Sequence, residues 1–251
     1  MMQGPAILEA KNVAKSYGGL KVLTDVNFHV TQGEIVGIIG PNGAGKTTLM
    51  NLISRLTSIT GGVLVYKGET INDKKPYEMS KMGISRTFQV VKPFGGLSVL
   101  ENVMVGAFYG KRGAKSKQEA IAAAEEALDI VGLGNVKDRD PRTLPLAQRK
   151  KLEVARALAM DPDLLLLDEV MAGLDARELD DMMAEIMKLK AKGITLIVIE
   201  HVMKAIMGIS DRIVVLHLGR KIFEGNPHEV VREPAVIEAY LGSKYARNKE
   251  S

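Results

Sequence analysis

One stretch, residues 35–50, constrains more than any other what this chain can fold into. It begins as a short apolar run, turns through the glycine-rich residues 40–45 and continues into a helix-compatible segment that starts at Lys46. Two glycines five positions apart, followed directly by Lys and Thr, are typical of a loop that wraps a phosphate group. The N–H groups of such a loop and of the next helix direct positive partial charge at the anion. The sequence therefore predicts a strand, a phosphate-binding loop and a helix, in this order.

Each residue type in this stretch has a physical role. Gly43 and Gly45 are expected to adopt positive φ and to let the backbone approach a phosphate without a Cβ in the way. Lys46 adds a full positive charge near the β- and γ-phosphates, and the Thr47 hydroxyl is expected to ligate Mg²⁺. The alternative is a glycine-rich turn that joins a strand to a helix and binds nothing. The candidate nucleotide-binding residues are Gly40, Pro41, Asn42, Gly43, Ala44, Gly45, Lys46, Thr47 and Thr48.

Length and composition limit the classes of protein that the chain can represent. Its 251 residues suffice for one large α/β domain or for two small lobes that share a core. The net charge of +4 is too mild and dispersed to indicate nucleic-acid binding by itself. The chain has no cysteine, which excludes disulfides and is compatible with a reducing compartment. Residues 1–12 lack the blocks of a signal peptide, and no apolar run approaches the roughly 18 residues that span a bilayer. We therefore expect a soluble chain that serves a membrane only by docking.

Hydrophobic patterning predicts an α/β fold. Antiparallel strands are expected within residues 6–30, with a further strand at residues 63–66. Residues 98–158 have mostly helical periodicity and are the best candidate for a separate helical lobe. Within this block Ser116 and Glu119 have the spacing of a capping box, in which each side chain satisfies a helix N–H group.

The second half of the chain alternates apolar strands with helices. Strands are expected at residues 164–167, 194–199 and 213–218, with a helix at residues 176–191 between the first two. Continuous apolar strands that alternate with helices indicate a mostly parallel sheet covered on both faces.

Polar side chains follow three of the predicted strands. Asp168 and Glu169 come directly after residues 164–167. A carboxylate at that position suits Mg²⁺, and a second one can face the water that attacks the γ-phosphate. His201 follows the strand expected at residues 194–199 and can hydrogen-bond the γ-phosphate. Gln89 follows a strand expected at residues 83–88, and its amide carbonyl can hold Mg²⁺ or the attacking water. The alternatives are a strand that simply ends in two acids, a structural histidine and a glutamine without special role.

Tyr17 stands immediately before the predicted turn at residues 18–19. An aromatic ring there can stack on a flat ligand, or it can pack against the edge of a small sheet. The residues together resemble the ATPase subunit of an ABC transporter, over essentially the whole chain. The elements that carry this resemblance are Tyr17 as the adenine-stacking aromatic, residues 40–48 as Walker A, Gln89 as the Q-loop, residues 164–169 as Walker B, residues 173–175 as the D-loop and His201 as the switch histidine.

The resemblance implies ATP and Mg²⁺ as cofactors and assigns roles to individual residues. The catalytic residues it implies are Glu169, His201, Gln89 and Lys46, and the metal ligands are Thr47, Gln89 and Asp168. It also places Asp175 beside the nucleotide.

The fold implied is a P-loop NTPase core of RecA type with an antiparallel β-lobe and a helical lobe, within a single ABC ATPase domain over residues 1–251. Its parts are expected at residues 6–95 for the P-loop core with the β-lobe, 96–158 for the helical lobe, 159–225 for the rest of the core and 226–251 for the C-terminal helices and tail.

Further residues narrow the resemblance to a subfamily. Residues 86–89, 97–103, 224–227 and 239–242 are similar to the ATPases of branched-chain amino acid importers, a group that also includes transporters for amides, urea and other amino acids. The implied partners are a second ATPase chain, two transmembrane permease subunits and, indirectly, an extracytoplasmic solute-binding protein, with no nucleic acid. The implied location is peripheral, on the cytoplasmic face of the cell membrane.

The sequence departs from the family at the signature stretch, residues 144–148, where LPLAQ stands in place of LSGGQ. Pro145 lacks both the serine hydroxyl and a backbone N–H, and Leu146 and Ala147 give the backbone less freedom to approach a phosphate than glycine would. The resemblance still places Pro145, Ala147 and Gln148 against the ATP of a partner chain. The helix N-terminus retains positive partial charge.

This departure leads to the hypothesis of a dimer with a second, different ATPase subunit, although a homodimer stays possible. Two other functional classes remain open. One is a nucleotide-binding module that dimerises on ATP but hydrolyses it poorly, which the LPLAQ stretch favours and Glu169 and His201 oppose. The other is a nucleic-acid ATPase of the same fold, which the single domain copy and the absence of sustained heptads oppose.

Overall fold

The computed structural model describes residues 5–88 and 92–241, with the backbone alone at residue 241. The chain divides into two compact units. Unit 1 combines Met1–Lys74 with Ile197–Ser251, and unit 2 is the continuous segment Lys75–Leu196. Unit 1 is thus built from both ends of the chain.

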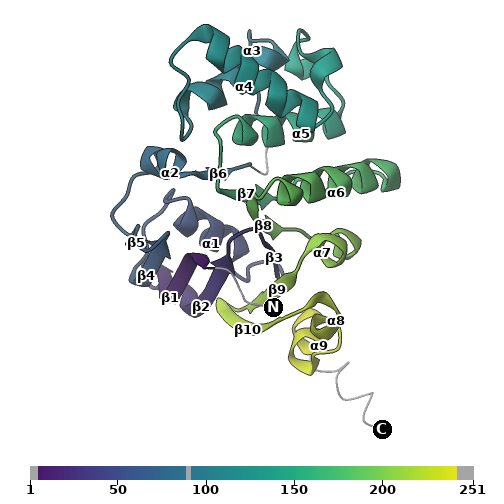
Figure 1. The fold of residues 1–251 in the computed structure, drawn as a ribbon. Helices are drawn as coiled ribbons and strands as arrows, with labels where there is room; N and C mark the ends of the chain where they lie inside the picture. The colour runs from purple at the N-terminus through teal and green to yellow at the C-terminus, as the bar shows by residue number, and fades with distance from the viewer. Residues whose placement is uncertain (1–4, 89–91, 242–251) are drawn as a thin grey trace. The chain divides into compact units, whose positions relative to one another are not determined.

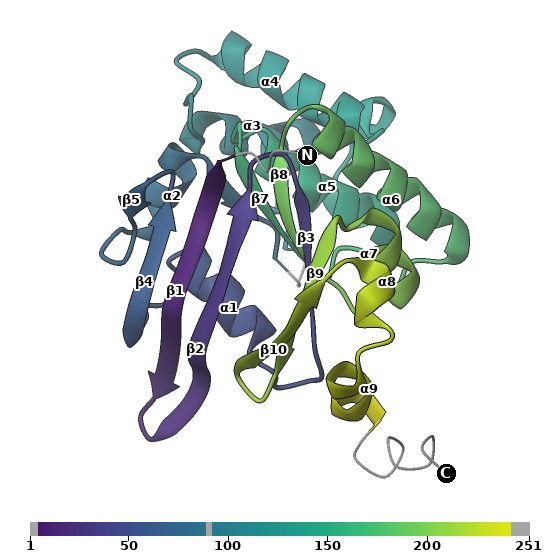
Figure 2. The same cartoon turned by 60° about the horizontal axis from the view of Figure 1, so that its bottom comes forward.

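Unit 1 contains a four-stranded antiparallel sheet in the order β2-β1-β4-β5, whose three longer strands lie side by side in Figure 2. Its strands are β1 (Ala6–Tyr17), β2 (Leu20–Thr31), β4 (Gly61–Tyr66) and β5 (Glu69–Thr70). The predicted antiparallel strands are confirmed. The pairing of β1 with β2 shifts register between Ala10 and Val13, where Asn12 has φ 51°. This bulge explains why burial follows even positions at Leu8 and Ala10 but odd positions from Val13 onward.

A second sheet of unit 1 carries the predicted phosphate-binding segment. Its core strand β3 (Ile35–Ile39) pairs in parallel with β9 (Arg212–His217), and β10 (Arg220–Gly225) pairs antiparallel with β9. All five residues of β3 are buried, as the continuous apolar run predicts. The helices of this unit are α1 (Lys46–Ile53), α7 (Met203–Ile209), α8 (Pro227–Val230) and α9 (Pro234–Leu241).

Unit 2 contains the parallel pair β6 (Ile84–Arg86) and β7 (Leu164–Asp168), while β8 (Thr195–Ile199) starts in this unit and continues into unit 1. Its helices are α2 (Pro76–Met82), α3 (Val99–Tyr109), α4 (Lys117–Ile130), α5 (Leu146–Leu158) and α6 (Ala176–Ala191), with short 3-10 turns at Gly134–Val136 and Pro141–Thr143. Figure 1 shows α3, α4 and α5 packed together, which agrees with the predicted helical block. A Cβ at Gly106 of α3 would lie 2.3 Å from the carbonyl oxygen of Arg156 of α5, so glycine permits this close approach.

One predicted detail of the helical block is wrong in part. Ser116 does cap α4, because its hydroxyl accepts a hydrogen bond from the Glu119 N–H at 3.2 Å. The Glu119 carboxylate, however, accepts from the N–H of Lys115 at 2.8 Å and not from that of Ser116. A complete capping box occurs instead at the start of α3, between Ser98 and Glu101. No helix in the described ranges is long and apolar enough to cross a membrane.

Candidate nucleotide-binding site

The phosphate loop (residues 40–45) has a backbone that depends on glycine at its two ends. Gly40 has φ 153°, and a Cβ there would lie 2.1 Å from the carbonyl oxygen of Leu216 on β9. Gly45 is the residue before α1, with φ 100°, and its Cβ would lie 2.5 Å from Leu23 Cδ2. Gly43 also has positive φ, 78°, but has open space around it. The positive φ predicted for Gly43 and Gly45 is confirmed, and β3 and α1 flank the loop as expected.

Lys46 is the first residue of α1, and its side chain folds back over the loop. Nζ donates to the carbonyl oxygens of Gly40 at 2.6 Å and Pro41 at 3.0 Å, and the residue is only 6% exposed. The loop carbonyls therefore hold the ammonium group within the turn that is predicted to surround a phosphate. Thr47 is exposed and Thr48 is half-buried at the same helix end, where α1 has no side-chain cap. Uncapped N–H groups at a helix start are suited to bind an anion.

The helix α9 contacts this loop through Tyr240, a contact that no local sequence pattern predicts. The Tyr240 hydroxyl of α9 is hydrogen-bonded to the main chain of Gly40. Burial raises the pKa of Tyr240 above its ordinary value, and the bond to Gly40 acts in the opposite direction. The two residues are 200 positions apart in sequence, so no local pattern relates them.

Two other candidate residues belong to unit 1. Tyr17 ends β1 with 48% of its surface exposed, and Lys15 Nζ lies 4.6 Å from the ring centroid. The Lys15 ammonium is fixed there by a 2.7 Å hydrogen bond to the Ser58 carbonyl. The ring is therefore available for stacking, and a cation already lies over it. His201 is exposed and follows the end of β8 at Ile199, as its sequence position predicts.

Asp168, the last residue of β7, is buried in unit 2 with 2% exposure. One carboxylate oxygen, Oδ2, pairs with the Arg86 guanidinium at 2.8 Å. The other, Oδ1, is buried and accepts no hydrogen bond from any part of the chain that the structure describes. The Asp168 N–H donates to the Thr87 hydroxyl at 3.1 Å, which fixes the strand end. An unsatisfied buried carboxylate oxygen fits a role toward Mg²⁺ or its bound water.

The described residues contain no cluster of three or more His, Cys, Asp or Glu side chains that could hold a metal ion. A site made wholly of protein carboxylates is thus absent from residues 5–88 and 92–241.

Glu169 follows Asp168 and has an unusual backbone. Its φ is 52°, in the left-handed region that residues with a Cβ rarely adopt. Its carbonyl oxygen accepts a 2.8 Å hydrogen bond from Lys150 Nζ. The turn that presents the predicted catalytic carboxylate is therefore held from α5.

The signature stretch (residues 144–148) starts α5. Pro145 occupies the cap position and makes no side-chain capping bond, so the first N–H groups of the helix have no side-chain partner from it. Ala147 is 8% exposed, and Gln148 Oε1 is buried without a hydrogen-bond partner in the described residues. The signature stretch also neighbours the predicted D-loop, because a Cβ at Gly173 would lie 3.5 Å from Leu146 Cδ2.

Asp175, predicted to lie near the nucleotide, also has a structural role. Its Oδ1 accepts hydrogen bonds from the N–H groups of Arg177 at 2.9 Å and Glu178 at 2.8 Å, and Glu178 completes a capping box at the start of α6. This cap fixes the position at which α6 begins, directly after the D-loop.

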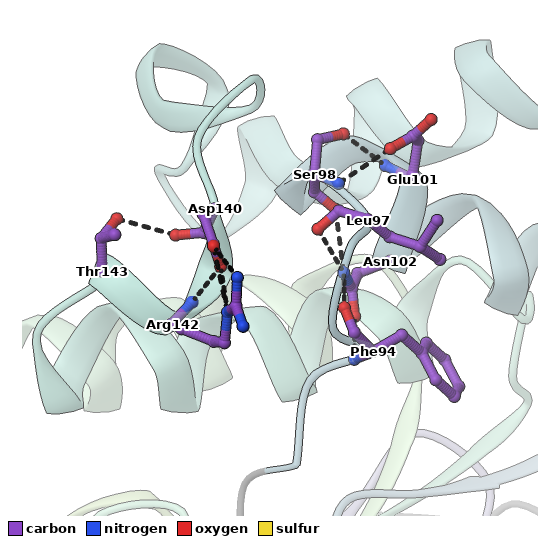
Figure 3. A network of polar contacts seen from close by, with 8 residues as sticks. All are labelled: Phe94, Leu97, Ser98, Glu101, Asn102, Asp140, Arg142 and Thr143. Carbon is purple, nitrogen blue, oxygen red and sulfur yellow. Dashed lines mark hydrogen bonds and ion pairs between the residues drawn. The ribbon is translucent and has the colours of Figure 1, made fainter.

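Gln89 lies outside the described residues, so its predicted role stays a prediction. The loop that follows it, residues 92–97, is held by two side chains that the sequence analysis missed. Asn102 of α3, with no exposed surface, donates from Nδ2 to the carbonyls of Phe94 at 3.2 Å, Leu97 at 3.3 Å and Ser98 at 2.9 Å. Its Oδ1 accepts from the Phe94 N–H at 2.8 Å, as Figure 3 shows. The only sequence signal is an asparagine at the start of the apolar run that follows Glu101 in α3.

Arg156, near the end of α5, holds the same loop from another side. Its guanidinium lies 4.6 Å from the centroid of the Phe94 ring, and Nη1 lies 3.4 Å from the Lys92 carbonyl oxygen. Nη1 is also 2.5 Å from the Glu153 carboxylate, whose pKa is raised by burial and lowered by Arg156, with burial dominant. Unit 2 therefore brings together the Walker B carboxylates, the signature stretch, the D-loop and this loop, while unit 1 holds the phosphate loop, Tyr17 and His201.

Comparisons with known proteins agree with these features. A family model described as ABC transporter matches residues 23–172, and one described as branched-chain amino acid ATP-binding cassette transporter matches residues 220–246. The high-affinity branched-chain amino acid transport ATP-binding protein BraF of Pseudomonas aeruginosa is 37% identical over 249 residues, which cover 94% of this chain and 98% of that protein. A probable branched-chain amino acid transport ATP-binding protein LivG of Archaeoglobus fulgidus is 35% identical, covering 95% and 96%.

Solved structures extend the similarity to the fold. A nucleotide-free ATP-binding cassette from an ABC transporter has a TM-score of 0.86 and 31% identity, with 95% of this chain and 100% of that chain covered. An ADP conformation of such a cassette also has a TM-score of 0.86, at 33% identity and with the same coverage. A dimeric bacterial ABC transporter cassette has a TM-score of 0.80 and 30% identity, covering 88% of this chain and 98% of that chain.

Proposed function

The chain is an ATPase of the ABC transporter family, and we propose that it drives import of branched-chain amino acids or related small polar solutes. The cargo is supported by the C-terminal match over residues 220–246 together with the named relatives, which are aligned over nearly their whole length. The activity is supported above all by the phosphate loop, where Gly40 and Gly45 permit a backbone that no other residue could adopt without a clash.

The residues that we propose for catalysis act mainly by positioning and charge, which is how phosphoryl transfer is accelerated. The N–H groups of the phosphate loop bind the β- and γ-phosphates, and Lys46 places its ammonium among them. Glu169 polarises the attacking water, and His201 and Gln89 orient the γ-phosphate and that water. Tyr17 stacks on the adenine.

Mg²⁺ fits the residues present, with Thr47 and Asp168 as its proposed protein ligands and Gln89 as a third. When bound there with ATP, the ion would supply positive charge that offsets the negative charge of the phosphates. The buried and unsatisfied Asp168 Oδ1 supports this assignment.

The proposed assembly is a dimer of ATPase chains that associates with two transmembrane permease subunits on the cytoplasmic face of the membrane. A solute-binding protein delivers cargo to the permease subunits from the opposite side of the membrane. We favour a second, different ATPase chain as the partner because of the LPLAQ stretch. Pro145 removes a donor from the helix end that would face the partner's ATP, and losing one aimed donor costs on the order of 3 kcal/mol of transition-state stabilisation. The partner's intact signature would then serve the ATP on this chain.

A second candidate function, a nucleotide-binding module with weak hydrolysis, is favoured by that same stretch. Steady-state ATP hydrolysis by the purified chain, measured over a range of protein concentrations, separates the two. We expect the chain alone to bind ATP tightly and to turn it over slowly, and we expect turnover to rise once a partner ATPase chain with an intact signature is added. Turnover of the chain alone that rises faster than linearly with concentration would mean a self-sufficient homodimer. The Glu169→Gln variant should retain binding and lose turnover. Tight binding with equal, negligible turnover in both proteins, even with a partner ATPase chain present, would contradict the catalytic proposal.

A further inference from the structure

The predicted catalytic glutamate is held in an unfavourable backbone conformation, and the structure shows what holds it. Glu169 has φ 52°, and residues with a Cβ persist in this region only when their surroundings fix them. Its carbonyl oxygen accepts from the N–H of Ala172 at 3.4 Å, a long bond, and from Lys150 Nζ at 2.8 Å. The second bond carries a full positive charge on the donor and is therefore the stronger of the two.

Lys150 has the features of a residue with a specific partner. It lies in the second turn of α5 and is 7% exposed, which is unusual for a lysine. A buried ammonium group is tolerated when its charge is compensated by acceptors, and the Glu169 carbonyl is one of them. The neighbouring Lys151 makes a contrasting contact, a 2.6 Å ion pair with Glu185 of α6, away from the catalytic turn.

We propose that Lys150 is the positioning residue for Glu169, and that it fixes the left-handed turn from which the carboxylate faces the attacking water. Lys150 itself touches neither water nor nucleotide in this role. The proposal rests on the proposed function, in which Glu169 polarises the water. The Glu169 carbonyl carbon is bonded to the Cα that carries the side chain, so the bond from Lys150 restrains the backbone from which the carboxylate projects.

The placement of Lys150 ties this turn to α5. The helix begins directly after Pro145 of the signature stretch, and the side chain of Lys150 projects from its second turn. The rigid start of α5 therefore connects the signature stretch with the catalytic turn of the same chain.

The test compares four variants with the wild-type chain, assembled with whichever ATPase partner the earlier experiment shows to be required. Lys150→Met keeps the buried aliphatic stem and removes the donor. Lys150→Arg keeps charge and donors. Lys151→Met is the matched control on the same helix, and Glu169→Gln tests the proposed function separately. The measurements are kcat and KM for ATP, equilibrium ATP binding without hydrolysis, and urea unfolding.

We expect Lys150→Met to lower kcat at least tenfold with KM and ATP binding within about twofold of wild type, since small misplacements of a catalytic group have effects up to about a hundredfold. Lys150→Arg should retain most of the turnover. Lys151→Met should lose stability but keep its kcat within about twofold. A wild-type kcat in folded Lys150→Met, or an equal loss in Lys151→Met, would overturn the positioning role. If Lys150→Met does not fold, Lys150→Gln replaces it under the same criteria.

The control variant keeps this proposal apart from the proposed function. If Glu169→Gln retains turnover, the catalytic role of Glu169 is wrong, whatever Lys150 does. If Glu169→Gln loses turnover and Lys150→Met does not, only the positioning role of Lys150 is wrong.

Discussion

Single glycines decide whether the phosphate loop can form. At Gly40 a Cβ would meet a backbone oxygen at 2.1 Å, and no rotamer change can move that atom away. At Gly43 a Cβ would meet nothing within 4 Å, so only the positive φ disfavours another residue. Substitutions at the two positions therefore separate the cost of a steric clash from the cost of backbone strain within one loop.

We expect Gly43→Ala to lower the free energy of unfolding by about 1–2 kcal/mol, the usual effect of left-handed φ on a residue with a Cβ. Gly40→Ala should lower it by a clearly larger amount, because the strand β9 must also move. Urea denaturation of both variants measures the difference. Equal losses in the two variants would mean that the contact with Leu216 is relieved at little cost.

Tyr17 offers a direct test of adenine stacking, because the chain has no tryptophan. The Tyr17→Trp variant would carry the only indole, and ATP binding should change its fluorescence if the ring stacks on the base. Tyr17→Ala should weaken ATP binding by about 1–3 kcal/mol, the range found for aromatic stacking on bases. An unchanged indole signal at ATP concentrations that saturate a separate binding assay would exclude Tyr17 from the adenine site.

Residues whose role depends on a local pattern were predicted from sequence, and residues that depend on distant partners were not. The positive φ of Gly43 and Gly45 follows from spacing alone. Lys150 and Asn102 were missed because the contacts described for them are with backbone groups, which every residue carries and no sequence pattern marks.

At the scale of elements, the loop at residues 92–97 is fastened to α3 by Asn102. Substitution by leucine keeps similar volume but removes the partners of the part-buried Phe94 and Leu97 carbonyls and of the Phe94 N–H. We expect Asn102→Leu to lower the free energy of unfolding by about 2–4 kcal/mol. Asn102→Asp should have a larger effect at neutral pH, because it buries a charge and faces the carbonyls with no donor.

The exposed Asn135 provides the control for this pair of variants, since Asn135→Leu should change stability by less than about 0.5 kcal/mol. Urea denaturation measures all three. A loss in Asn102→Leu no larger than in Asn135→Leu would show that water replaces the lost hydrogen bonds.

The same element-level contacts predict a pH dependence at Glu153 of α5. Burial, opposed by Arg156, raises the pKa of Glu153 above its ordinary value of 4.5 in the folded state. The folded chain thus binds this proton more tightly than the unfolded chain, so its contribution to stability is present below pH 4.5 and is lost as pH rises through the folded pKa.

The Glu153→Gln variant isolates this contribution, because other groups titrate alike in both proteins. We expect the free energy of unfolding of the wild type, minus that of the variant, to decrease as pH rises from 4.5 and then to level off. Urea denaturation at a series of pH values provides the curve. A difference that increases with pH would mean that Arg156 outweighs burial.

Helices and strands were predicted well where the hydrophobic pattern is strong, as in the periodic helix α6 and the short, continuously apolar strand β7. The backbone N–H group that binds the Glu119 carboxylate was not predicted correctly, because Lys115 and Ser116 offer adjacent N–H groups and only the local backbone decides between them. The division expected from the family assigns one continuous segment to the helical lobe, residues 96–158. The compact units are not all continuous segments, since unit 1 combines Met1–Lys74 with Ile197–Ser251.

At the scale of the whole molecule, the degenerate signature stretch predicts how two copies of this chain behave. Restoring the usual residues with Pro145→Ser, Leu146→Gly and Ala147→Gly together returns a hydroxyl, a backbone N–H and freer backbone. We expect the triple variant to hydrolyse ATP at least tenfold faster than the wild type when each is the only ATPase present, as the loss of an aimed donor commonly has a hundredfold effect or more.

Turnover at several protein concentrations, with Glu169→Gln added to each protein as the background control, measures this gain. If the triple variant is folded and no faster than the wild type, the LPLAQ stretch is competent for its own dimer. The argument for a different partner chain would then lose its basis.

Because unit 1 combines two segments that are far apart in the chain, the phosphate loop cannot be completed early in synthesis on the ribosome. The phosphate loop is synthesised early, yet Leu216 lies against Gly40, Gly219 donates its N–H to the Ala44 carbonyl at 3.2 Å, and Tyr240 bonds the main chain of Gly40. At roughly 5–20 residues per second, these neighbours appear on the order of ten to forty seconds after the loop itself. A nascent chain arrested at the end of unit 2 carries the Walker A sequence but lacks the strand β9 that shapes it. Nucleotide can thus meet a finished loop only after β9 and α9 have been synthesised.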